Sequence, residues 1–410
     1  MADINIALEL LENDPVKLRN RGDIYYSMGN FKNAILDYEI ALSRDNKRFK
    51  FLENKIKLAK EKLDEIESVG KSKAQPNDKE DKIGIENKIE EIIAEIRKEA
   101  RSEVNTLVHY TKVFVANIYV TINQAKMNYS NAIYMNDPME GKIFFEYLND
   151  KKIESAYLNG EKRTETSVYL GSFLPAEEND GDTSHEDELV MWRTYGKDEN
   201  GMEAAGCCVV LSSDFFKLKI TDKENASNKD ESEELLNVVY VKKQKAQKKI
   251  TNDPKGQIEN LIKLLKGELN KLIFLRNKYK PKDEFYKEIE NAIFKQLSTI
   301  SYLFKSSDYE FEHEVRVITY MPRNSDAIKY RAISDIKAPP KRFYIESFND
   351  ILPFVKKIYL GPKVENYQQW SLYFDYEIRQ RAKEIENLAS PPYVIKPSEI
   401  EIMKSDCKFQ

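Results

Sequence analysis

The chain has few of the residues that build disulfide frameworks or thiolate metal sites. Its 410 residues include three cysteines and three histidines. Cys207 and Cys208 are adjacent, and Cys407 lies near the end of the chain, a spacing that suits neither a disulfide framework nor a zinc site. We therefore expect no metal site. Residues 206–211 read as a buried strand, in which thiols are inert.

Long apolar runs are also missing. No segment reaches the roughly 18 consecutive apolar residues of a transmembrane helix. The first residues, Met1–Asn5, lack the basic region and apolar run of a signal peptide. We therefore predict a cytoplasmic protein without a membrane partner.

No excess of charge of one sign is present. Lys and Arg number 65 against 69 Asp and Glu, for a formal net charge of −4, so no overall field draws the chain to nucleic acid or acidic lipid. The basic run 242–249 suits contact with phosphate backbones or a solvated segment that offsets the acidic stretch before it, and we favour the second interpretation. A nucleic acid partner is therefore not favoured.

The standard phosphate-binding loops do not occur. Neither G-x-x-x-x-G-K-[ST] nor G-x-G-x-x-G is found. This excludes nucleotide binding through those two loops and leaves other modes of nucleotide binding open.

The N-terminal region alternates small and aromatic residues at helical spacing. The positions are Leu18, Gly22, Tyr25, Gly29, Phe31, Ala34, Tyr38 and Ala41. Small residues let two helices approach, and aromatic residues fill the remaining space. In this pattern residues 15–48 resemble one tetratricopeptide repeat, a helix-turn-helix unit of about 34 residues. We expect a preceding helix to end over 6–11 and a following helix over 49–66.

One repeat is fewer than the roughly three that make a stable array. The resemblance therefore implies that these helices pack on the rest of the protein or on a protein partner. We predict a tetratricopeptide-like helical unit over residues 1–67. The polar stretch 68–82 is typical of a flexible linker, and a second domain follows over 83–410.

The second domain mixes helical and strand patterns. Apolar residues at helical spacing predict helices over 83–104, 258–279, 284–304 and 365–384, and short apolar runs predict strands over 107–115, 167–173, 206–212, 238–241, 311–320 and 356–360. Residues 221–234 form a polar insertion that we expect to be a loop. Helices segregated from non-consecutive strands indicate an α+β domain.

The most polar strand pattern covers residues 310–318. Strict alternation places Phe311, His313, Val315 and Val317 on one face and Glu310, Glu312, Glu314 and Arg316 on the other. Three carboxylates in one row repel one another. The row therefore needs solvent, a cationic partner or a substrate that develops positive charge. A solvated outer face is the interpretation that this segment alone favours.

Several separated motifs of the second domain occur in a fixed order. They are His109-Tyr110, residues 136–140 (NDPME), 171–173 (GSF) with 191–195 (MWRTY) and Gly201, 312–316 (EHEVR) and 358–363 (IYLGPK). In these motifs the chain resembles the bacterial domain of unknown function 2971 family over roughly residues 105–403. The acidic stretch 177–188 departs from that pattern. The family name implies no activity.

Three of these motifs also resemble the ADP-ribosyltransferases. That family uses an Arg or His on a first strand, a Ser or Tyr on a second, and a Glu, often in Glu-x-Glu, on a later one. His109, Ser172 and Glu312-x-Glu314 follow this order. The resemblance implies NAD as co-substrate.

The resemblance also implies a role for each residue. Cleaving the nicotinamide bond creates an oxocarbenium-like sugar that a fixed carboxylate stabilises. Glu314 takes that role, and Glu312 accepts a proton from the attacking group. The residues expected to bind the cofactor are His109 at the adenosine ribose, Ser172 at the nicotinamide pocket, Tyr110 or Trp192 stacked on a ring, and Arg316.

Each of these residues also has a structural interpretation. His109 alternates with apolar neighbours and suits a satisfied interior histidine, and His313 is expected in the core. Trp192 and Tyr195 are more often core aromatics than stacking platforms, and residues 136–138 suit a turn. Two functions therefore stay open. One is ADP-ribosyl transfer targeted by the helical repeat, and the other is a non-enzymatic adaptor or ligand-sensing scaffold.

Overall fold

The computed structural model describes residues 14–27, 30–69, 75–135, 137–163, 166–176, 185–217, 233–244, 247–332, 341–388 and 394–408. The chain divides into two compact units. One comprises residues 1–82 with 274–289, and the other comprises residues 83–273 with 290–410. Among the described residues, no helix combines the length and apolarity that crossing a bilayer requires.

In the first part of the N-terminal unit, the described helices are α2 (Pro15–Ser27), α3 (Phe31–Arg44), α4 (Asn46–Phe49) and α5 (Leu52–Val69). Leu18, Ala34 and Tyr38 are among the residues of its core. At Gly22, a Cβ atom would lie 2.6 Å from the Tyr38 ring, so α2 and α3 approach this closely only because position 22 has no side chain. The predicted helix-turn-helix is confirmed as a helical region. Its assignment as a tetratricopeptide repeat stays a prediction.

Parts of the segment 68–82, predicted to be a linker, are helical. Helix α5 continues to Val69 and α6 (Pro76–Glu99) begins seven residues before position 83. Proline is favoured in the first turn of a helix, where its missing N–H costs nothing, and this explains the early start. Residues 70–74 lie outside the described residues, as do residues 6–11.

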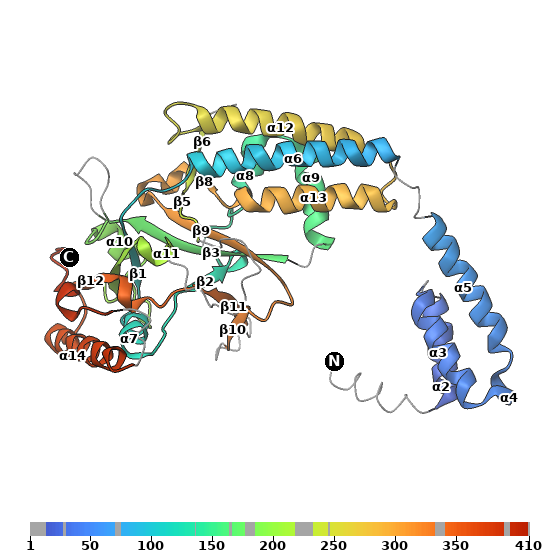
Figure 1. Ribbon diagram of the computed structural model, residues 1–410, viewed down its shortest axis with the longest axis horizontal. Coiled ribbons are helices and arrows are strands. Elements are labelled where there is room, and N and C mark those ends of the chain that lie inside the picture. The colour runs from blue at the N-terminus through green and yellow to red at the C-terminus, as the bar shows by residue number, and fades with distance from the viewer. Residues whose placement is uncertain are drawn as a thin grey trace. The chain divides into compact units, whose positions relative to one another are not determined.

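The larger unit is built on a branched ten-stranded sheet (Figure 1). The strands run in the order β10-β11-β2-β3-β1-β4-β12-β13, and β9 pairs with both β3 and β5. Their bounds are β1 Thr106–Thr111, β2 Asn128–Asn131, β3 Thr166–Pro175, β4 Cys207–Ser212, β5 Leu236–Asn237, β9 Val315–Pro322, β10 Lys329–Ala332, β11 Lys341–Glu346, β12 Val355–Leu360 and β13 Glu401–Lys404. A smaller sheet orders β7 (Gln247–Ile250), β6 (Val239–Gln244) and β8 (Phe304–Ser306).

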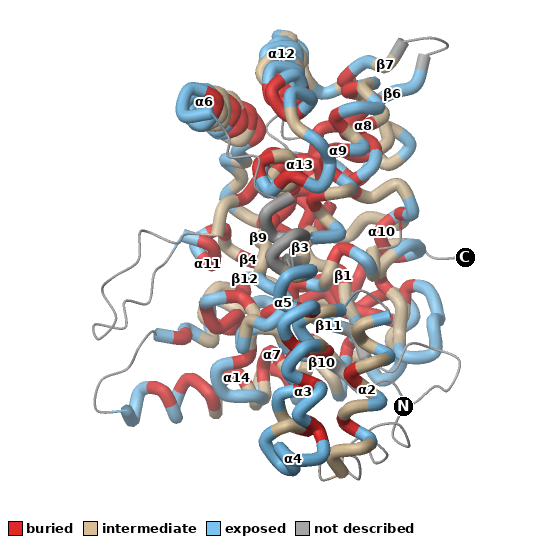
Figure 2. Tube along the Cα trace, turned by 90° about the vertical axis from the view of Figure 1, so that its right-hand side faces the viewer, coloured by how far each residue is buried: buried red, intermediate tan, exposed pale blue. Residues whose placement is uncertain are grey.

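The other described helices are α7 (Val113–Thr121), α8 (Ile143–Leu148), α9 (Lys151–Arg163), α10 (Leu189–Thr194), α11 (Asp214–Lys217), α12 (Gln257–Arg276), α13 (Glu284–Ser301) and α14 (Tyr367–Glu386), with 3₁₀ turns η1 (Ala132–Tyr134), η2 (Ser307–Glu312), η3 (Leu352–Phe354) and η4 (Pro397–Glu399). Residues of α7, α11 and α14 join the apolar cluster on one face of the sheet, and residues of α10 join the cluster on the other face. Buried residues follow the strands and the inner sides of these helices (Figure 2). The expected α+β character is confirmed.

Successive side chains of β1 and β4 point to opposite faces of the sheet and enter two different apolar clusters. Leu107 and Val209 enter the larger apolar cluster, which α7 and α14 complete. Val108, Tyr110 and Val210 enter a second cluster around Trp192. Both faces of this part of the sheet are therefore covered, which explains why β4 is apolar throughout.

Most predicted elements of the second domain are present with shifted ends. The predicted strand 107–115 stops at Thr111 and is followed by α7, and the predicted helix 284–304 stops at Ser301 before β8. Of the predicted loop 221–234, only Glu233 and Glu234 belong to the described residues.

The continuous strand predicted over 310–318 is wrong in its first half. Residues 307–312 form η2, His313 has a left-handed backbone with φ of 46°, and β9 begins at Val315. Left-handed backbone cannot continue a strand, so the alternation does not extend across His313. The imidazole is exposed rather than in the core, and its expected burial is wrong as well.

Candidate functional site

A pocket lies where two strands share one edge of β3. The other edge of β3 pairs with β9 over residues 166–173. On the shared edge, β2 pairs with residues 169–170 and β1 with residues 174–175. Among the described residues, no strand pairs with residues 171–173 on that side, and side chains of β1 and β3 line the gap.

The pocket has a volume of about 150 Å³. Its wall contains His109 from β1, Ser172 from β3, and Glu312 and Glu314 from the segment before β9, and the remaining lining residues are Tyr110, Met135, Asp137, Glu140, Phe173, Leu174 and Tyr195. Three residues far apart in the sequence, His109, Ser172 and Glu314, therefore meet at one cavity.

The His109 imidazole is oriented by the free edge of β3. Its Nδ1 lies 3.4 Å from the carbonyl oxygen of Ser172, which makes Nδ1 the donor in that contact. Burial lowers the pKa of His109, and the carbonyl only partly opposes that effect. The ring is therefore neutral at pH 7 and leaves Nε2 as an acceptor.

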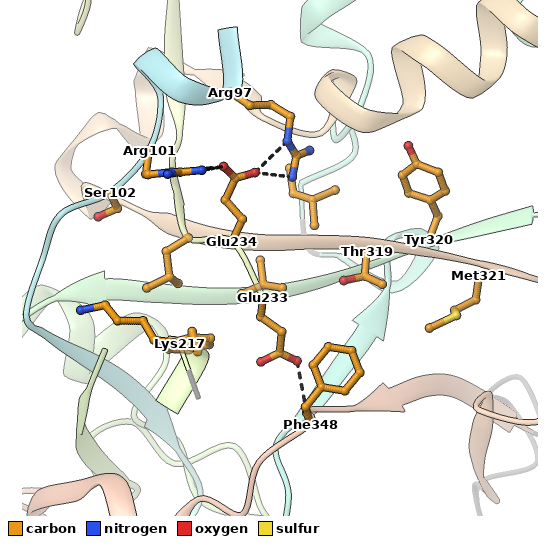
Figure 3. Close-up of a pocket in the computed structure, with 14 residues that line it drawn as sticks. Arg97, Arg101, Ser102, Lys217, Glu233, Glu234, Thr319, Tyr320, Met321 and Phe348 are labelled. Carbon is orange, nitrogen blue, oxygen red and sulfur yellow. Dashed lines mark hydrogen bonds and ion pairs between the residues drawn. The ribbon is translucent and has the colours of Figure 1, made fainter. Parts of the chain in front are cut away.

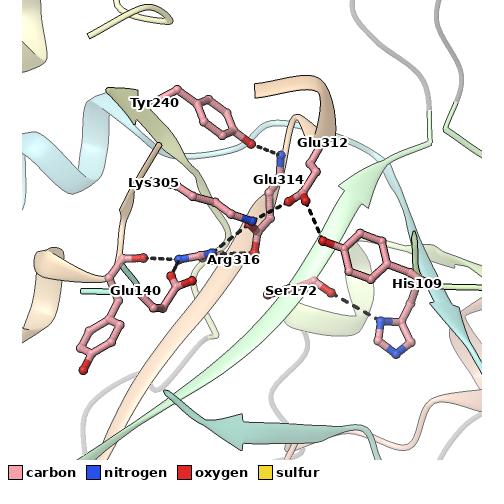
Figure 4. A network of polar contacts seen from close by, with 10 residues as sticks. His109, Glu140, Ser172, Tyr240, Lys305, Glu312, Glu314 and Arg316 are labelled. Carbon is pink, nitrogen blue, oxygen red and sulfur yellow. Dashed lines mark hydrogen bonds and ion pairs between the residues drawn. The ribbon is translucent and has the colours of Figure 1, made fainter. Parts of the chain in front are cut away.

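A charged network lies beneath Glu314 (Figure 4). Arg316 donates from Nε to Glu314 Oε1 at 2.6 Å and from Nη2 to Glu314 Oε2 at 2.9 Å, and it also pairs with Glu140. Lys305 Nζ donates to Glu314 at 2.8 Å and to Glu312 at 2.5 Å. Three carboxylates therefore share two cations, which leaves one excess negative charge.

These groups are held out of water. Glu312 is 3% exposed, Glu314 4% and Arg316 0%. The solvated outer face that the sequence pattern favoured is therefore wrong, and the cationic partner that it allowed is present. Arg316 belongs to the same sequence motif as the glutamates and was a candidate for their cationic partner. Lys305 was not identified as a partner from the sequence.

Burial and pairing set the charge of Glu314. Burial alone would raise its pKa, but Arg316 and Lys305 outweigh burial and hold the pKa at about 2. For Glu140, burial outweighs Arg316 and raises the pKa. Glu314 is thus ionised at every physiological pH, in a fixed position, without being able to relax toward water.

Neighbouring tyrosines complete the arrangement. The Tyr195 hydroxyl donates to Glu312 Oε1 at 2.6 Å. The Glu314 backbone N–H donates to the Tyr240 hydroxyl at 2.8 Å. Tyr195 was expected to be a core aromatic, and instead it reaches the pocket wall.

Two predicted cofactor-binding residues do not line the pocket. Trp192 is fully buried, contacts Tyr110 edge to face, and donates from Nε1 to Asp187 at 2.6 Å. Arg316 lies behind Glu140 and Glu314. Both residues support the wall from outside. Tyr110 lines the pocket, while its hydroxyl is bonded to the carbonyl of His185 at 2.7 Å.

The segment after η1 supplies Asp137, which the sequence pattern assigned to a turn, and Glu140, which belongs to the same motif. Asp137 Oδ1 accepts from the Met139 backbone N–H at 2.8 Å, so the turn interpretation of Asp137 is confirmed. Asn136 lies outside the described residues. Glu140, from the same motif, reaches Arg316. Glu140 comes close to residues 312–316 only in the folded protein, and no pattern in the sequence around Glu140 indicates this contact.

A larger cavity adjoins the pocket. Its volume is about 780 Å³, and it shares Met135, Asp137 and Glu140 with the pocket. Arg323 and Lys142 are its cationic lining residues, and its aromatic lining residues are Tyr134, Tyr157, Tyr169, Phe294, Tyr302 and Phe343. Its size is within the range of about 300–1,000 Å³ that is usual for small-molecule sites.

A third cavity, of about 690 Å³, lies on the opposite edge of β3 beside β9 (Figure 3). There Arg97 and Arg101 clamp Glu234, each at 2.8 Å. Glu233 points away from that clamp toward Phe348, whose N–H lies 3.3 Å from the carboxylate. Burial raises the pKa of Glu233 to about 7, although hydrogen bonds from Tyr129 and Phe348 oppose the rise.

A metal centre has no support among the described residues, where no cluster of His, Cys, Asp and Glu has a geometry that could hold an ion. Three of the acidic groups of the pocket, Glu140, Glu312 and Glu314, pair with Lys305 and Arg316.

Comparison with known proteins identifies one family. The family described as "Protein of unknown function (DUF2971)" matches residues 191–317. No curated protein and no solved structure matches the chain. The matched segment begins one residue before Trp192 and ends one residue after Arg316, so it contains Tyr195, Lys305, Glu312 and Glu314. The resemblance to this family of uncharacterised proteins is thus supported over residues 191–317, whereas Glu140, His109 and Ser172 lie outside the matched segment.

Proposed function

We propose that the larger unit binds NAD, cleaves the bond between nicotinamide and ribose, and transfers the ADP-ribosyl group to an acceptor. The observation that carries this proposal is the meeting of His109, Ser172 and Glu314 at one pocket. These residues belong to three separate motifs, and nothing in their sequence positions requires their side chains to share a cavity.

The electrostatics of the pocket suit this reaction. Nicotinamide carries a positive charge in NAD, and the sugar becomes oxocarbenium-like as the bond breaks. Glu314 is ionised and fixed by two cations, and the surrounding network retains one excess negative charge. A preorganised carboxylate of this kind stabilises developing positive charge without reorganising.

The volumes of the two cavities suggest that the dinucleotide occupies both of them. At about 150 Å³ the pocket is smaller than a usual small-molecule site and has room for a single ring. The adjoining cavity of about 780 Å³ takes the remainder, with Arg323 and Lys142 available to the diphosphate. His109 lines the smaller pocket and not the adjoining cavity, so we propose that it contacts the nicotinamide end of the dinucleotide instead of the adenosine ribose.

Glu312 is the candidate base for the acceptor. Its carboxylate lines the pocket beside Glu314 and is oriented by Tyr195 and Lys305. Deprotonating an incoming nucleophile at this position places the attacking atom next to the sugar.

The test is release of nicotinamide from NAD, followed by chromatography, with a broad panel of protein, nucleic acid and small-molecule acceptors. Glu314→Gln is expected to lower kcat by about 100-fold or more, as is usual when one electrostatic stabiliser of a transition state is removed. Glu310→Gln is the matched control, because it makes the same chemical change two residues before Glu312 and outside the pocket lining. Absence of turnover across the panel, or a Glu314→Gln variant with full activity, rejects the proposal.

The N-terminal helices are proposed to bind a protein partner. Ile24, Leu36, Phe51 and Leu58 are large apolar residues there with 49% or more of their surface exposed. If NAD binds without turnover, the same arrangement describes a ligand-sensing scaffold that reports to this partner.

A further inference from the structure

Two polar side-chain atoms in the pocket lack hydrogen-bond partners among the described residues. They are Oδ2 of Asp137 and Oγ of Ser172, and both atoms are buried. Asp137 is only 8% exposed, and its other carboxylate oxygen is already used by the Met139 N–H. Buried polar groups are nearly always paired in folded proteins, so two unpaired atoms in one cavity point to a ligand.

The chemistry of the two atoms differs. A carboxylate oxygen only accepts a hydrogen bond, whereas a serine hydroxyl donates one. A primary carboxamide offers the reverse set, since its NH₂ donates and its C=O accepts. Phe173, Leu174 and Met135 line the same pocket and supply apolar surface for a ring beside such a group.

We infer that the pocket recognises a ring bearing a primary carboxamide, with the amide NH₂ donating to Asp137 Oδ2 and the amide oxygen accepting from Ser172 Oγ. This inference rests on the proposed function and specifies how the nicotinamide end of NAD is selected. It assigns to Asp137 a binding role in addition to its turn.

The inference predicts rejection of the corresponding acid. A ring carboxylate has no hydrogen to donate to Asp137 and carries a negative charge. That charge would lie beside Asp137 and beside a network that already has one more carboxylate than cations. A site built to accept a hydrogen bond discriminates strongly against an analogue that lacks the donor.

The experiment is equilibrium binding of nicotinamide and of nicotinate to the full-length protein, by calorimetry or by ligand-observed NMR. The wild type is expected to bind nicotinamide at least tenfold more tightly than nicotinate. In Asp137→Asn, the side-chain amide can donate to a carboxylate, so the ratio is expected to fall to about threefold or less. The Asn side-chain oxygen can still accept from Met139, which preserves the turn.

Ser172→Ala is the matched control. The serine hydroxyl donates to an oxygen that both ligands possess, so this variant is expected to weaken both and leave their ratio close to that of the wild type. Asp137→Ser, which also keeps a short acceptor for the turn, is used in place of Asp137→Asn if that variant does not fold, and it too is expected to lose the discrimination.

The outcomes separate this inference from the proposed function. Equal binding of the two ligands, no binding of either at millimolar concentration, or full discrimination in a folded Asp137 variant overturns the inference, whether or not NAD is turned over. Discrimination that depends on Asp137 supports it even if nicotinamide is never released from NAD, in which case only the proposed reaction is lost.

Discussion

Two glutamates of the larger unit, Glu314 and Glu233, have their pKa values shifted in opposite directions. Glu314 is held at a pKa of about 2 by Arg316 and Lys305 against the effect of burial, whereas burial raises the pKa of Glu233 to about 7. Each shift links protonation to folding. The contribution of Glu314 is present above its ordinary pKa of 4.5 and is lost as the pH falls toward 2. That of Glu233 is present below 4.5 and is lost as the pH rises through 7.

Glu233→Gln is expected to change the pH dependence of stability. Between pH 4.5 and 7 the unfolded state releases its proton before the folded state does, so the wild type becomes less stable as the pH rises. A neutral side chain removes this loss. At pH 8 the variant should therefore be more stable than the wild type, by up to about 3 kcal/mol, and at about pH 4.5 the gain should vanish. Urea unfolding at several pH values measures the difference, and a gain independent of pH would contradict the assignment.

Lys305→Met is expected to destabilise the folded protein by about 3–5 kcal/mol, because it leaves Glu312 and Glu314 with one fewer cation in a buried site. Adding Glu312→Gln restores the original excess of one negative charge and should recover part of that loss. The two single variants and the double variant form a cycle that urea unfolding can quantify. A double variant that is no more stable than Lys305→Met would show that charge balance is not what Lys305 provides.

At the scale of elements, β3 is the strand on which the pocket depends. One edge pairs continuously with β9, and the other is divided between β2 and β1. The division leaves the Ser172 carbonyl available to His109. A strand that pairs fully on both edges would have used this carbonyl in its ladder, and the pocket would have been closed.

Helix α9 packs closely on α13 at Gly160. A Cβ atom there would lie 2.3 Å from the backbone oxygen of Glu290, so Gly160→Ala must displace the backbone and should cost about 1–3 kcal/mol. Gly267→Ala in α12 is the control, because nothing lies within 4 Å of its Cβ position. It should gain about 0.5–1 kcal/mol from helix propensity. Thermal unfolding of both variants tests the pair, and equal effects would contradict the close contact.

At the scale of the whole molecule, the two proposed roles, the reaction with NAD and the binding of a protein partner, belong to different units. The residues of all three cavities lie between Arg97 and Phe348 and belong to the larger unit. The exposed apolar side chains Ile24, Leu36, Phe51 and Leu58 belong to the other.

Deletion of residues 1–69 is therefore expected to leave kcat/KM for NAD within about threefold of the full-length value. The deletion removes none of the described residues that line the three cavities. The same deletion should abolish modification of any protein target that the helices select, while activity on a small acceptor persists. A comparable loss of activity on both acceptor types would show that the helices contribute to the reaction itself.

Local patterns in the sequence predicted the secondary structure where the apolar residues followed a single spacing, either helical or strand-like. The apolar run around Val209 predicted β4, and the helical spacing before Ser301 predicted α13. The motif order also singled out His109, Ser172 and Glu314. The pattern failed at His313, because a single left-handed residue ended the alternation, and the glutamates on either side of it are buried instead of exposed.

What the sequence determined by itself was the type of most of the predicted elements and the residue types available for chemistry, because both follow from neighbours along the chain. Only the tertiary structure decided that Lys305 and Glu140 complete the charged network, that Trp192 and Arg316 stand behind the pocket wall, and that Asp137 and Ser172 leave two buried atoms unpaired in one cavity. These outcomes depend on how β1, β2 and β9 share the edges of β3. Pairing between distant segments is set by the packing of the whole domain, which no local period encodes.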